Sequence, residues 1–401
     1  MQELPFTKHL GVGKRTLGKK FFLSVYLANL FISLSYFVTA YVNSSFLSEH
    51  VPAASVGLLY AASSILSLLF LFFSSDILQE IKNRQLFLIL SALALVSTLG
   101  LAISSTPEKI FPLFVLLQSA PYLIAYCLDI FLEGGVTEEN TTGRVKGGYL
   151  TVTNVALVLS PVLAGFIIGT VGISGIYATS ALFIFPLFFI GMFGFQNFKD
   201  PKYERIQVFE ELKKTFSDQN LRNTLLSNLL LQVFYTIMVI YLPLLLLQNL
   251  SLPWEKVSIL LSIMLLPFLL FEFPAGALAD KVLGEKEMMM AGFLIMGLST
   301  FAVAFFDPKT SLFLLAGVLF TTRVGASLVE ITTESYFFKK TNGTEAEKIG
   351  LFRTTHPVSY FLGPIIATTA LFFGNIPSVF IILSLLMIPG IFLASTIEDT
   401  K

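Results

Sequence analysis

The chain has 401 residues, of which 55% are hydrophobic and only 13% are charged. A soluble domain carries roughly a quarter of charged residues, so this composition excludes a soluble protein and indicates one that crosses a membrane many times. The 26 basic and 26 acidic residues give a formal net charge of zero, and the basic residues are divided among loops, which argues against nucleic acid as a partner. The single cysteine, Cys127, excludes an internal disulfide and a zinc cluster. We expect no cofactor.

Apolar windows of about twenty residues predict twelve membrane-spanning helices. The basic first twenty residues continue into a full-length apolar segment without a small-residue cleavage site, so we expect the first span to be retained. Several connections are very short, which predicts antiparallel neighbours in an α-helical bundle. The spans lie at approximately 21–43, 55–75, 86–104, 110–132, 147–170, 173–195, 221–247, 256–276, 287–306, 311–336, 349–373 and 377–396.

The loop charges predict the orientation. With the N-terminus inside, 21 of the 26 basic residues fall on the cytoplasmic side, and three, Lys109, Lys256 and Lys309, fall outside. Because basic loops stay in the cytoplasm, both termini are predicted to be cytoplasmic. We expect a multi-pass integral protein of a prokaryotic inner (cell) membrane, present as a monomer.

A polar stretch interrupts the spans once, at residues 196–220. It divides the chain into an N-terminal half of six spans, residues 1–195, and a C-terminal half of six spans, residues 221–401. Ile206, Phe209, Leu212 and Phe216 recur at helical spacing within it, which predicts a short amphipathic helix. That helix either lies on the cytoplasmic membrane surface or is a solvated linker that touches both halves.

The two halves repeat each other weakly, at an offset of about 200 residues. Asp129 and Glu133, near the end of span four, correspond to Glu330 and Glu334 in span ten. Parallel six-helix repeats joined by a central loop are typical of transporters that bind their substrate between the halves.

The loop after span eight carries the most specific motif. Gly276, Asp280, Lys281 and Gly284 follow the pattern G-x-x-x-D-[RK]-x-G-[RK], with one residue inserted before the second glycine. This loop closely resembles the signature loop of the major facilitator superfamily, and the resemblance covers nearly the whole chain. It implies an all-α membrane protein with twelve transmembrane helices in two six-helix pseudo-repeats, acting as a secondary transporter by alternating access.

The resemblance also implies a cytoplasmic gate. Asp280 can accept hydrogen bonds from a helix N-terminus, where an exposed carboxylate is favoured by about 0.3–1 kcal/mol, and Gly284 permits a left-handed turn. The alternative is an ordinary charged turn. In the first half the loop is eroded, because Glu80 replaces the aspartate, Asn83 replaces the second glycine and Arg84 follows. The expected gate comprises Gly276, Asp280, Lys281, Gly284, Asp129, Glu133, Glu80 and Arg84.

Span ten carries the most informative polar face. Arg323, Ser327, Glu330 and Glu334 recur at i, i+4, i+7 and i+11, which places them on one side of a helix. A full charge at the centre of a span costs roughly 2.5–3.5 kcal/mol, so this face should line a cavity or meet charged partners.

Three further spans carry a polar face, and spans one, four, seven and ten are the helices that line the central cavity in the family. The polar faces therefore coincide with the path that the resemblance implies. The 41 phenylalanines are interpreted as lipid-facing and packing residues. The expected cavity residues are Tyr26, Asn29, Ser33, Tyr36, Gln118, Tyr122, Tyr126, Asn228, Gln232, Tyr235, Arg323 and Ser327.

Glu330 is the first candidate for a proton-coupling residue, since burial disfavours a charged carboxylate. The alternative is a structural ion pair with Arg323 or Arg353. Arg323 would either hold a carboxylate or phosphate group of a substrate or neutralise Glu330. His356 would relay protons, bind substrate or only pack. Glu334, Asp129 and Glu133 are interpreted as gate residues that pair with Arg144, Lys146 or Arg353.

The sequence thus predicts a transporter and not an enzyme, because no nucleophile or metal-ligand set accompanies the carboxylates. It contains no G-x-x-x-x-G-K-[ST] loop, which argues against pumping driven by ATP. The leading hypothesis is proton-coupled efflux of a small amphipathic molecule. The alternatives are uptake of a small metabolite, either neutral or anionic, and translocation of lipid on the same scaffold. The expected partners are the small-molecule substrate, the lipid bilayer and a proton.

Overall fold

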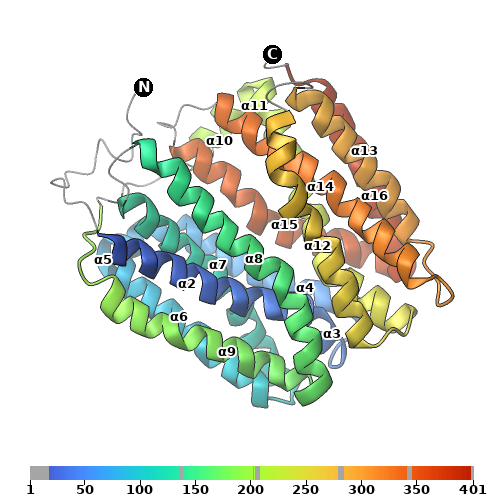
Figure 1. The fold of residues 1–401 in the computed structure, drawn as a ribbon, viewed down its shortest axis with the longest axis horizontal. Helices are drawn as coiled ribbons and strands as arrows, with labels where there is room; N and C mark the ends of the chain where they lie inside the picture. Colours follow the sequence, from blue (N-terminus) through green and yellow to red (C-terminus); the bar gives the residue numbers. More distant parts are fainter. Residues whose placement is uncertain are drawn as a thin grey trace. The chain divides into compact units, whose positions relative to one another are not determined.

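The computed structural model describes residues 18–135, 139–201, 203, 208–278, 284–340 and 346–398. In this part of the chain the regular structure is helical, without strands (Figure 1). The prediction of an all-α membrane protein with twelve spans is confirmed, and the observed ends lie within a few residues of the predicted ones. The spans are Lys19–Ala40, Ala53–Phe72, Asn83–Ile103, Pro107–Leu132, Thr151–Val171, Ile173–Gly194, Gln219–Asn249, Trp254–Phe271, Glu285–Val303, Leu312–Phe337, Leu351–Phe373 and Ile376–Ser395.

The chain forms two compact units. The first contains residues 1–46 and 62–206, and the second contains residues 47–61 and 207–401. The boundary at residue 206 falls inside the polar stretch 196–220, whereas residues 47–61 group with the second unit although they precede most of the first in sequence.

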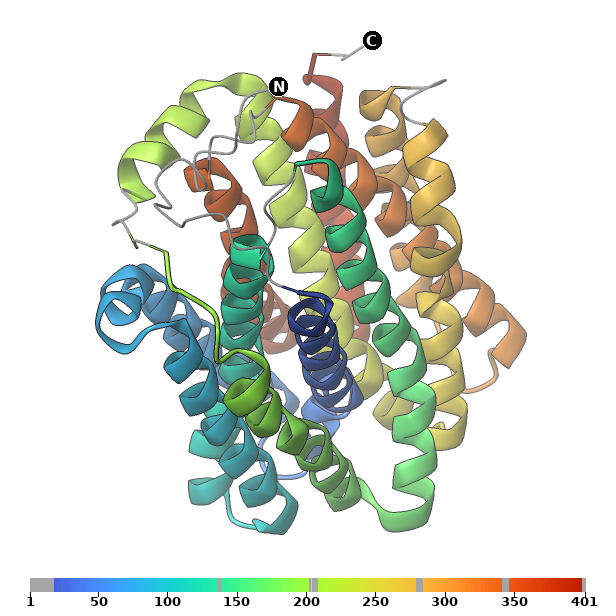
Figure 2. The ribbon, with the colours of Figure 1, turned by 60° about the vertical axis from the view of Figure 1, so that its left-hand side comes forward.

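The first unit contains five of the long helices, two shorter elements and the second half of α4. Its helices α6 and α9 run side by side, as both ribbon views show (Figures 1 and 2). Its elements are α2 (Lys19–Ala40), α5 (Ser74–Ile81), α6 (Asn83–Ile103), α7 (Pro107–Gly135), α8 (Glu139–Val171), α9 (Ile173–Phe189) and the π-helix η1 (Ile190–Gly194).

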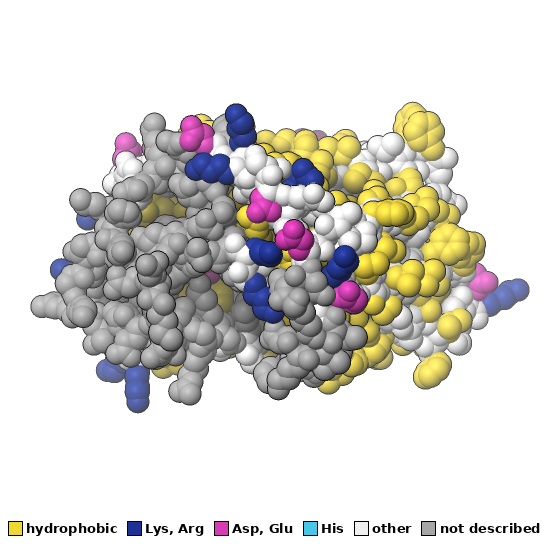
Figure 3. All heavy atoms as spheres, turned by 90° about the horizontal axis from the view of Figure 1, so that it is seen from above, with side chains coloured by type: hydrophobic (Ala, Val, Ile, Leu, Met, Phe, Trp, Pro, Cys, Tyr) yellow, Lys and Arg dark blue, Asp and Glu magenta, His cyan; other side chains and the backbone are white. Residues whose placement is uncertain are grey.

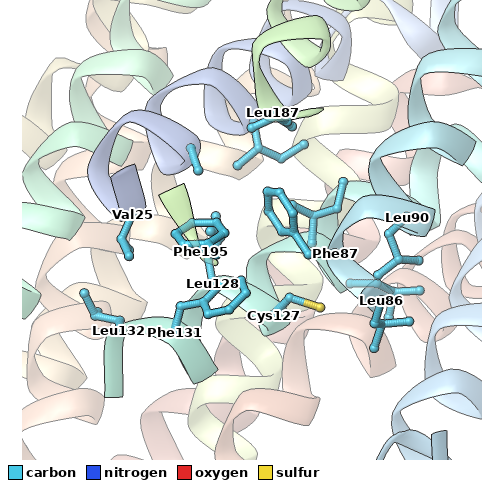
Figure 4. Packing of buried hydrophobic residues seen from close by; sticks show 14 of the residues in the cluster. Val25, Leu86, Phe87, Leu90, Cys127, Leu128, Phe131, Leu132, Leu187 and Phe195 are labelled. Atoms are coloured by element: carbon cyan, nitrogen blue, oxygen red, sulfur yellow. The ribbon is translucent and has the colours of Figure 1, made fainter. Parts of the chain in front are cut away.

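A buried aromatic cluster holds the ends of these helices together (Figure 4). The rings of Phe131 on α7 and Phe195 after η1 are stacked with centroids 4.0 Å apart, and Phe87 on α6 meets Phe195 edge to face at 5.4 Å. Such ring pairs contribute about 0.5–1.5 kcal/mol beyond the area they bury. Phenylalanine therefore provides the specific packing of this core.

The second unit begins with the first half of α4 (Ala53–Phe72), and α3 (Asn43–Ser48) lies across the boundary between the units. Within this unit α13 packs along both α14 and α16 (Figure 1). Its other elements are α10 (Val208–Ser217), α11 (Gln219–Leu244), the π-helix η2 (Leu245–Asn249), α12 (Trp254–Leu278), α13 (Glu285–Val303), α14 (Leu312–Lys340), α15 (Ala346–Phe373) and α16 (Ile376–Ser395).

The start of α4 is held in the second unit by close contacts with α15. The hydroxyl of Thr368 donates a hydrogen bond of 3.0 Å to the carbonyl of Ala54. A Cβ at Gly57 would lie 2.9 Å from the Thr368 hydroxyl and 3.0 Å from Cβ of Pro364, so only glycine allows this approach. These contacts explain why residues 47–61 belong to the second unit.

The amphipathic helix predicted in the polar stretch is α10, which packs against α11 and α15. Leu212 and Phe216 are more than one-third exposed, whereas Thr215 is buried. Ile206 and the side chain of Phe209 lie outside the described residues.

The connection between the second and third spans differs from the sequence analysis, which treated residues 76–84 as an eroded loop. Residues 74–81 form the helix α5, whose Ser74 and Leu78 are buried. Lys82 then adopts a φ of 65° and a ψ of 150° as the N-cap of α6, and Gly284 is the N-cap of α13 with a φ of 83°. The residue that takes the place of the second glycine is therefore Lys82 and not Asn83. The positive φ expected at Gly284 is confirmed.

We expect Lys82→Gly to stabilise the protein. A side chain with positive φ and extended ψ costs about 1–3 kcal/mol, and part of that gain is offset because glycine makes the unfolded chain more flexible. A net gain of about 1 kcal/mol would raise the melting temperature of the purified protein in detergent by about 2–4 °C. Gly284→Lys, the reciprocal change, should lower it. An unchanged or lower melting temperature for Lys82→Gly would contradict this account.

Candidate functional site

The polar face of span ten lies on α14 and becomes more exposed along the helix. Arg323 is 1% exposed and Ser327 is fully buried, whereas Glu330 is half-buried and the side chain of Glu334 is 33% exposed. Ser327 donates a hydrogen bond of 2.9 Å to the carbonyl of Val324 on its own helix. The arginine is therefore the deepest charge on this face.

Arg323 packs against two aromatic rings of α11. Its guanidinium carbon lies 5.0 Å from the ring centroid of Phe234 and 5.2 Å from that of Tyr235. Cation–π contacts of a desolvated guanidinium contribute about 2 kcal/mol or more. The Nε and Nη1 atoms of Arg323 are buried and have no hydrogen-bond partner among the described residues.

Glu330 accepts a hydrogen bond from the neighbouring helix α11. The hydroxyl of Tyr235 donates to its Oε2 atom over 2.7 Å. The Tyr235 ring also meets Phe268 of α12 edge to face at 5.8 Å. Tyr235 thus contacts Arg323 through its ring and Glu330 through its hydroxyl.

Arg353 of α15 pairs with Glu334. Its Nη1 atom lies 3.3 Å from Oε1 of Glu334, and the Arg353 side chain is 56% exposed. The sequence analysis had offered both Glu330 and Glu334 as its partner. His356, one turn further along α15, lies against Tyr360, with ring centroids 5.1 Å apart and ring planes tilted by 41°.

The polar residues of spans one and seven bind neighbouring helices in the same way. Asn29 on α2 donates from its Nδ2 to the hydroxyl of Thr153 on α8 at 3.0 Å, and Asn228 on α11 donates to the hydroxyl of Thr355 on α15 at 2.8 Å. Both asparagines are buried, and Ser33 donates to Oδ1 of Asn29. Each pair holds the first helix of its half to the fifth, which is consistent with a repeat of about 200 residues.

The remaining predicted cavity residues are partly accessible. Tyr126 on α7 donates to the hydroxyl of Ser74 at 3.3 Å, and Asp129 is exposed. The side chains of Glu133, Arg144 and Lys146 lie outside the described residues, so the pairs expected for them do too. The half-buried members of the predicted set are Tyr26, Tyr36, Gln118, Tyr122, Tyr126, Gln232 and Tyr235.

Only part of the expected gate is described. Asp280 and Lys281 lie outside the described residues, and Gly276 lies near the end of α12. In the first unit Glu80 is exposed, and Arg84 donates to the carbonyls of Gly191 and Met192 at 2.9 and 2.8 Å. Arg84 therefore caps the C-terminal end of η1.

Asp200, which follows the last span of the first unit, caps α6. Its Oδ1 atom accepts from the backbone N–H of Asn83 and from the hydroxyl of Tyr203, both at 2.7 Å. Burial, and then this hydrogen bond, raise the pKa of Tyr203, so its hydroxyl stays a donor at neutral pH.

On the part of the surface described in Figure 3, acidic and basic side chains gather in one area beside a hydrophobic area.

Sequence reasoning missed Phe234 and Phe268. Both are buried in the second unit, Phe234 against the guanidinium of Arg323 and Phe268 against Tyr235. They were interpreted as packing residues because nothing distinguishes one phenylalanine among 41. The only signal was the position of Phe234 beside Tyr235, at the edge of the polar face of span seven. Among the described residues no group of three or more His, Cys, Asp or Glu side chains could hold a metal ion.

Comparison with known proteins identifies the fold. The family model of the Major Facilitator Superfamily matches residues 25–263 and 224–400. The structure is similar to that of a mutant of the nucleoside transporter NupG, with a TM-score of 0.74 and 14% identity over 93% of this chain and 98% of that one. It is also similar to the POT family transporter PepTSo, with a TM-score of 0.75 and 10% identity over 96% of this chain and 98% of that one. No curated protein matches the sequence.

Proposed function

The chain belongs to the major facilitator superfamily, and from this membership we propose that it exports a small amphipathic solute by proton-coupled alternating access. The observation that carries the proposal is the hydrogen bond of 2.7 Å from Tyr235 to Glu330. It joins the two helices, α11 and α14, whose polar faces meet in the second unit. The nucleoside transporter NupG and the POT family transporter PepTSo, which it resembles at 14% and 10% identity, support the fold and leave the solute open.

Glu330 suits the role of a proton carrier because its partner on α11 is neutral. A cation beside a carboxylate favours its charged form and so opposes the binding of a proton. A tyrosine hydroxyl stabilises a carboxylate less and remains bonded to a protonated carboxyl group as well. Glu330 can therefore gain and lose a proton without losing its contact with α11.

Other ionisable groups near Glu330 also influence its charge. Arg323 lies two turns away on the same face of α14, and Tyr235 is the hydrogen-bond donor on α11. Transport would alter the exposure of this face and so the stability of the charge. The other ionisable groups on the helices that contact α14 include Arg222 and Tyr241 on α11, Glu255, Lys256 and Glu272 on α12, Glu285, Lys286 and Glu287 on α13, and Arg353, His356 and Tyr360 on α15.

The distribution of basic residues supports the membrane placement that we propose. With both termini in the cytoplasm, 21 of 26 basic residues lie on that side, as expected for a prokaryotic inner membrane. We propose that the chain acts as a monomer, because each half supplies its own set of buried helix contacts.

The test is transport into inside-out membrane vesicles with an acidic interior. We expect a fluorescent amphipathic compound, from a panel of cations, neutral molecules and anions, to accumulate inside and to dissipate the pH gradient as it does so. A protonophore should abolish the accumulation. Accumulation that ignores the protonophore would contradict proton coupling, and accumulation only in right-side-out vesicles would favour uptake. Movement of labelled phospholipid without any solute would favour lipid translocation.

A further inference from the structure

We infer that Arg323 is the binding group for an oxyanion, a carboxylate or phosphate, on the transported solute. This inference rests on the proposed transport function and assigns the chemical class of the solute. The charge of an arginine persists at every physiological pH, so it must be balanced by contacts or by a bound group. In an apolar span an unbalanced charge is costly, because no water or polar group is there to stabilise it.

The protein itself supplies only part of the balance. Two rings, Phe234 and Tyr235, lie against the guanidinium at 5.0 and 5.2 Å. Cation–π contacts offset part of the charge but offer no lone-pair acceptor to the N–H groups. Its Nε and Nη1 atoms are buried and have no hydrogen-bond partner among the described residues. A buried donor without an acceptor destabilises a protein, and in a native structure it requires an explanation.

The acidic residues on the same face of α14 have other contacts. Glu330 accepts the hydroxyl hydrogen of Tyr235, and Glu334 pairs with Arg353. The anion that completes the hydrogen bonds of Arg323 would therefore arrive with the solute. Carboxylates and phosphates fit this purpose, because they bridge two nitrogen atoms of a guanidinium in its own plane.

The surroundings of Arg323 also indicate the body of the solute. Phe234 and Phe268 are buried, and Tyr235 presents its ring between Arg323 and Phe268. An aromatic or aliphatic group beside the oxyanion would meet these rings. At 1% exposure the guanidinium is closed off in this structure, so the solute reaches it only when the surrounding helices move, as alternating access requires.

The test compares ligands that differ only in charge. Melting of the purified protein in detergent is measured with 3-phenylpropanoate, its amide and its methyl ester, and with decanoate, phenyl phosphate and inorganic phosphate. We expect the organic anions to raise the melting temperature at lower concentrations than the neutral analogues. A response to carboxylates alone, or to phosphates alone, identifies the group, and a response to inorganic phosphate alone would overturn the need for an apolar body.

Two variants locate the effect. Arg323→Gln should raise the Kd for the anions at least tenfold and leave the Kd for the amide and ester unchanged. Arg222→Gln removes a cation of the same unit that lies outside the site and should behave like the wild type.

Several results would overturn the inference. They are equal stabilisation of the wild type by neutral and anionic analogues, an anion preference that survives in Arg323→Gln, and no response to any anion. The comparison of ligands on the wild type holds even if Arg323→Gln does not fold. Proton-coupled transport of neutral solutes alone would overturn this inference and leave the proposed function intact. Anion binding without proton-coupled transport would do the reverse.

Discussion

Replacing Gly325 with alanine should lower the melting temperature by about 5–10 °C, and replacing it with leucine should prevent the second unit from folding. Gly325 lies where α14 crosses α13. A Cβ at this position would lie 2.7 Å from the carbonyl oxygen of Gly292 and 2.8 Å from the backbone nitrogen of Met296. Both atoms belong to a helix backbone, so neither can rotate away.

The contact is reciprocal, so a small movement of either helix would not remove the clash. A Cβ at Gly292 would lie 2.8 Å from the carbonyl oxygen of Gly325 and 2.7 Å from Cγ2 of Val329. Small residues at such crossings let the backbones of membrane helices approach closely. Adding atoms to a packed core costs about 1–3 kcal/mol, and here the two helices would have to separate.

Gly317 on the same helix is the matched control, because nothing lies within 4 Å of a Cβ placed there. Gly317→Ala should keep or raise the melting temperature, since alanine is favoured over glycine in a helix by up to about 1 kcal/mol. The measurement is the melting temperature in detergent, with the yield of monodisperse protein for the leucine variant. Equal melting temperatures for Gly325→Ala and Gly317→Ala would contradict the packing argument.

The course of the chain through the membrane could be predicted because it depends on local properties. A run of about twenty apolar residues must become a helix in a bilayer, whatever it packs against. The ends of the spans were therefore predicted within a few residues. The helix α5 was missed because its eight residues are too few to cross a membrane, so a search for apolar windows of about twenty residues does not detect it.

Properties that depend on two segments could not be predicted. The sequence places Gly325 and Gly292 in adjacent spans, but a helical glycine has many possible roles, and their contact appears only when α13 and α14 are packed. Residues 47–61 join the second unit through Ala54 and Gly57, for which periodicity gives no signal. The place of the second glycine was given to Asn83, whereas Lys82 has the positive φ, because the degenerate loop offers no glycine to fix the register.

At the candidate site, too, the sequence predicted the properties of a single helix but not the contacts between helices. Helical spacing placed Arg323, Glu330 and Glu334 on one face, and their gradient of exposure agrees with it. Spacing could not assign their contacts. In the structure Glu334 forms an ion pair with Arg353, and Glu330 accepts a hydrogen bond from Tyr235. Whether this face carries solute and protons stays a prediction, which the vesicle and ligand experiments test.

Replacing Glu330 with glutamine is expected to abolish accumulation driven by a pH gradient. Glutamine has nearly the same shape, and its Oε1 can still accept the hydroxyl hydrogen of Tyr235, which now donates over 2.7 Å to Glu330. It cannot bind or release the coupling proton. The contact between α11 and α14 should therefore persist while the coupling is lost.

The size of the effect follows from the driving force. A gradient of one pH unit supplies about 1.4 kcal/mol for each proton, so exchange of one proton for one solute can concentrate the solute about tenfold. The wild type should approach this ratio in inside-out vesicles, and Glu330→Gln should only equilibrate the solute, to a ratio of about one. Equilibration should no longer respond to pH between about 5.5 and 7.5.

Glu334→Gln is the matched control, four residues further along the same helix. Glu334 is partly exposed and pairs with Arg353 over 3.3 Å, and such pairs contribute about 0–1 kcal/mol to stability. The control should thus melt at most a few degrees lower and still accumulate the solute. If Glu330→Gln concentrates the solute as the wild type does, the coupling proton binds elsewhere. If both variants lose accumulation alike, the effect comes from the acidic face as a whole and not from the bond between Tyr235 and Glu330.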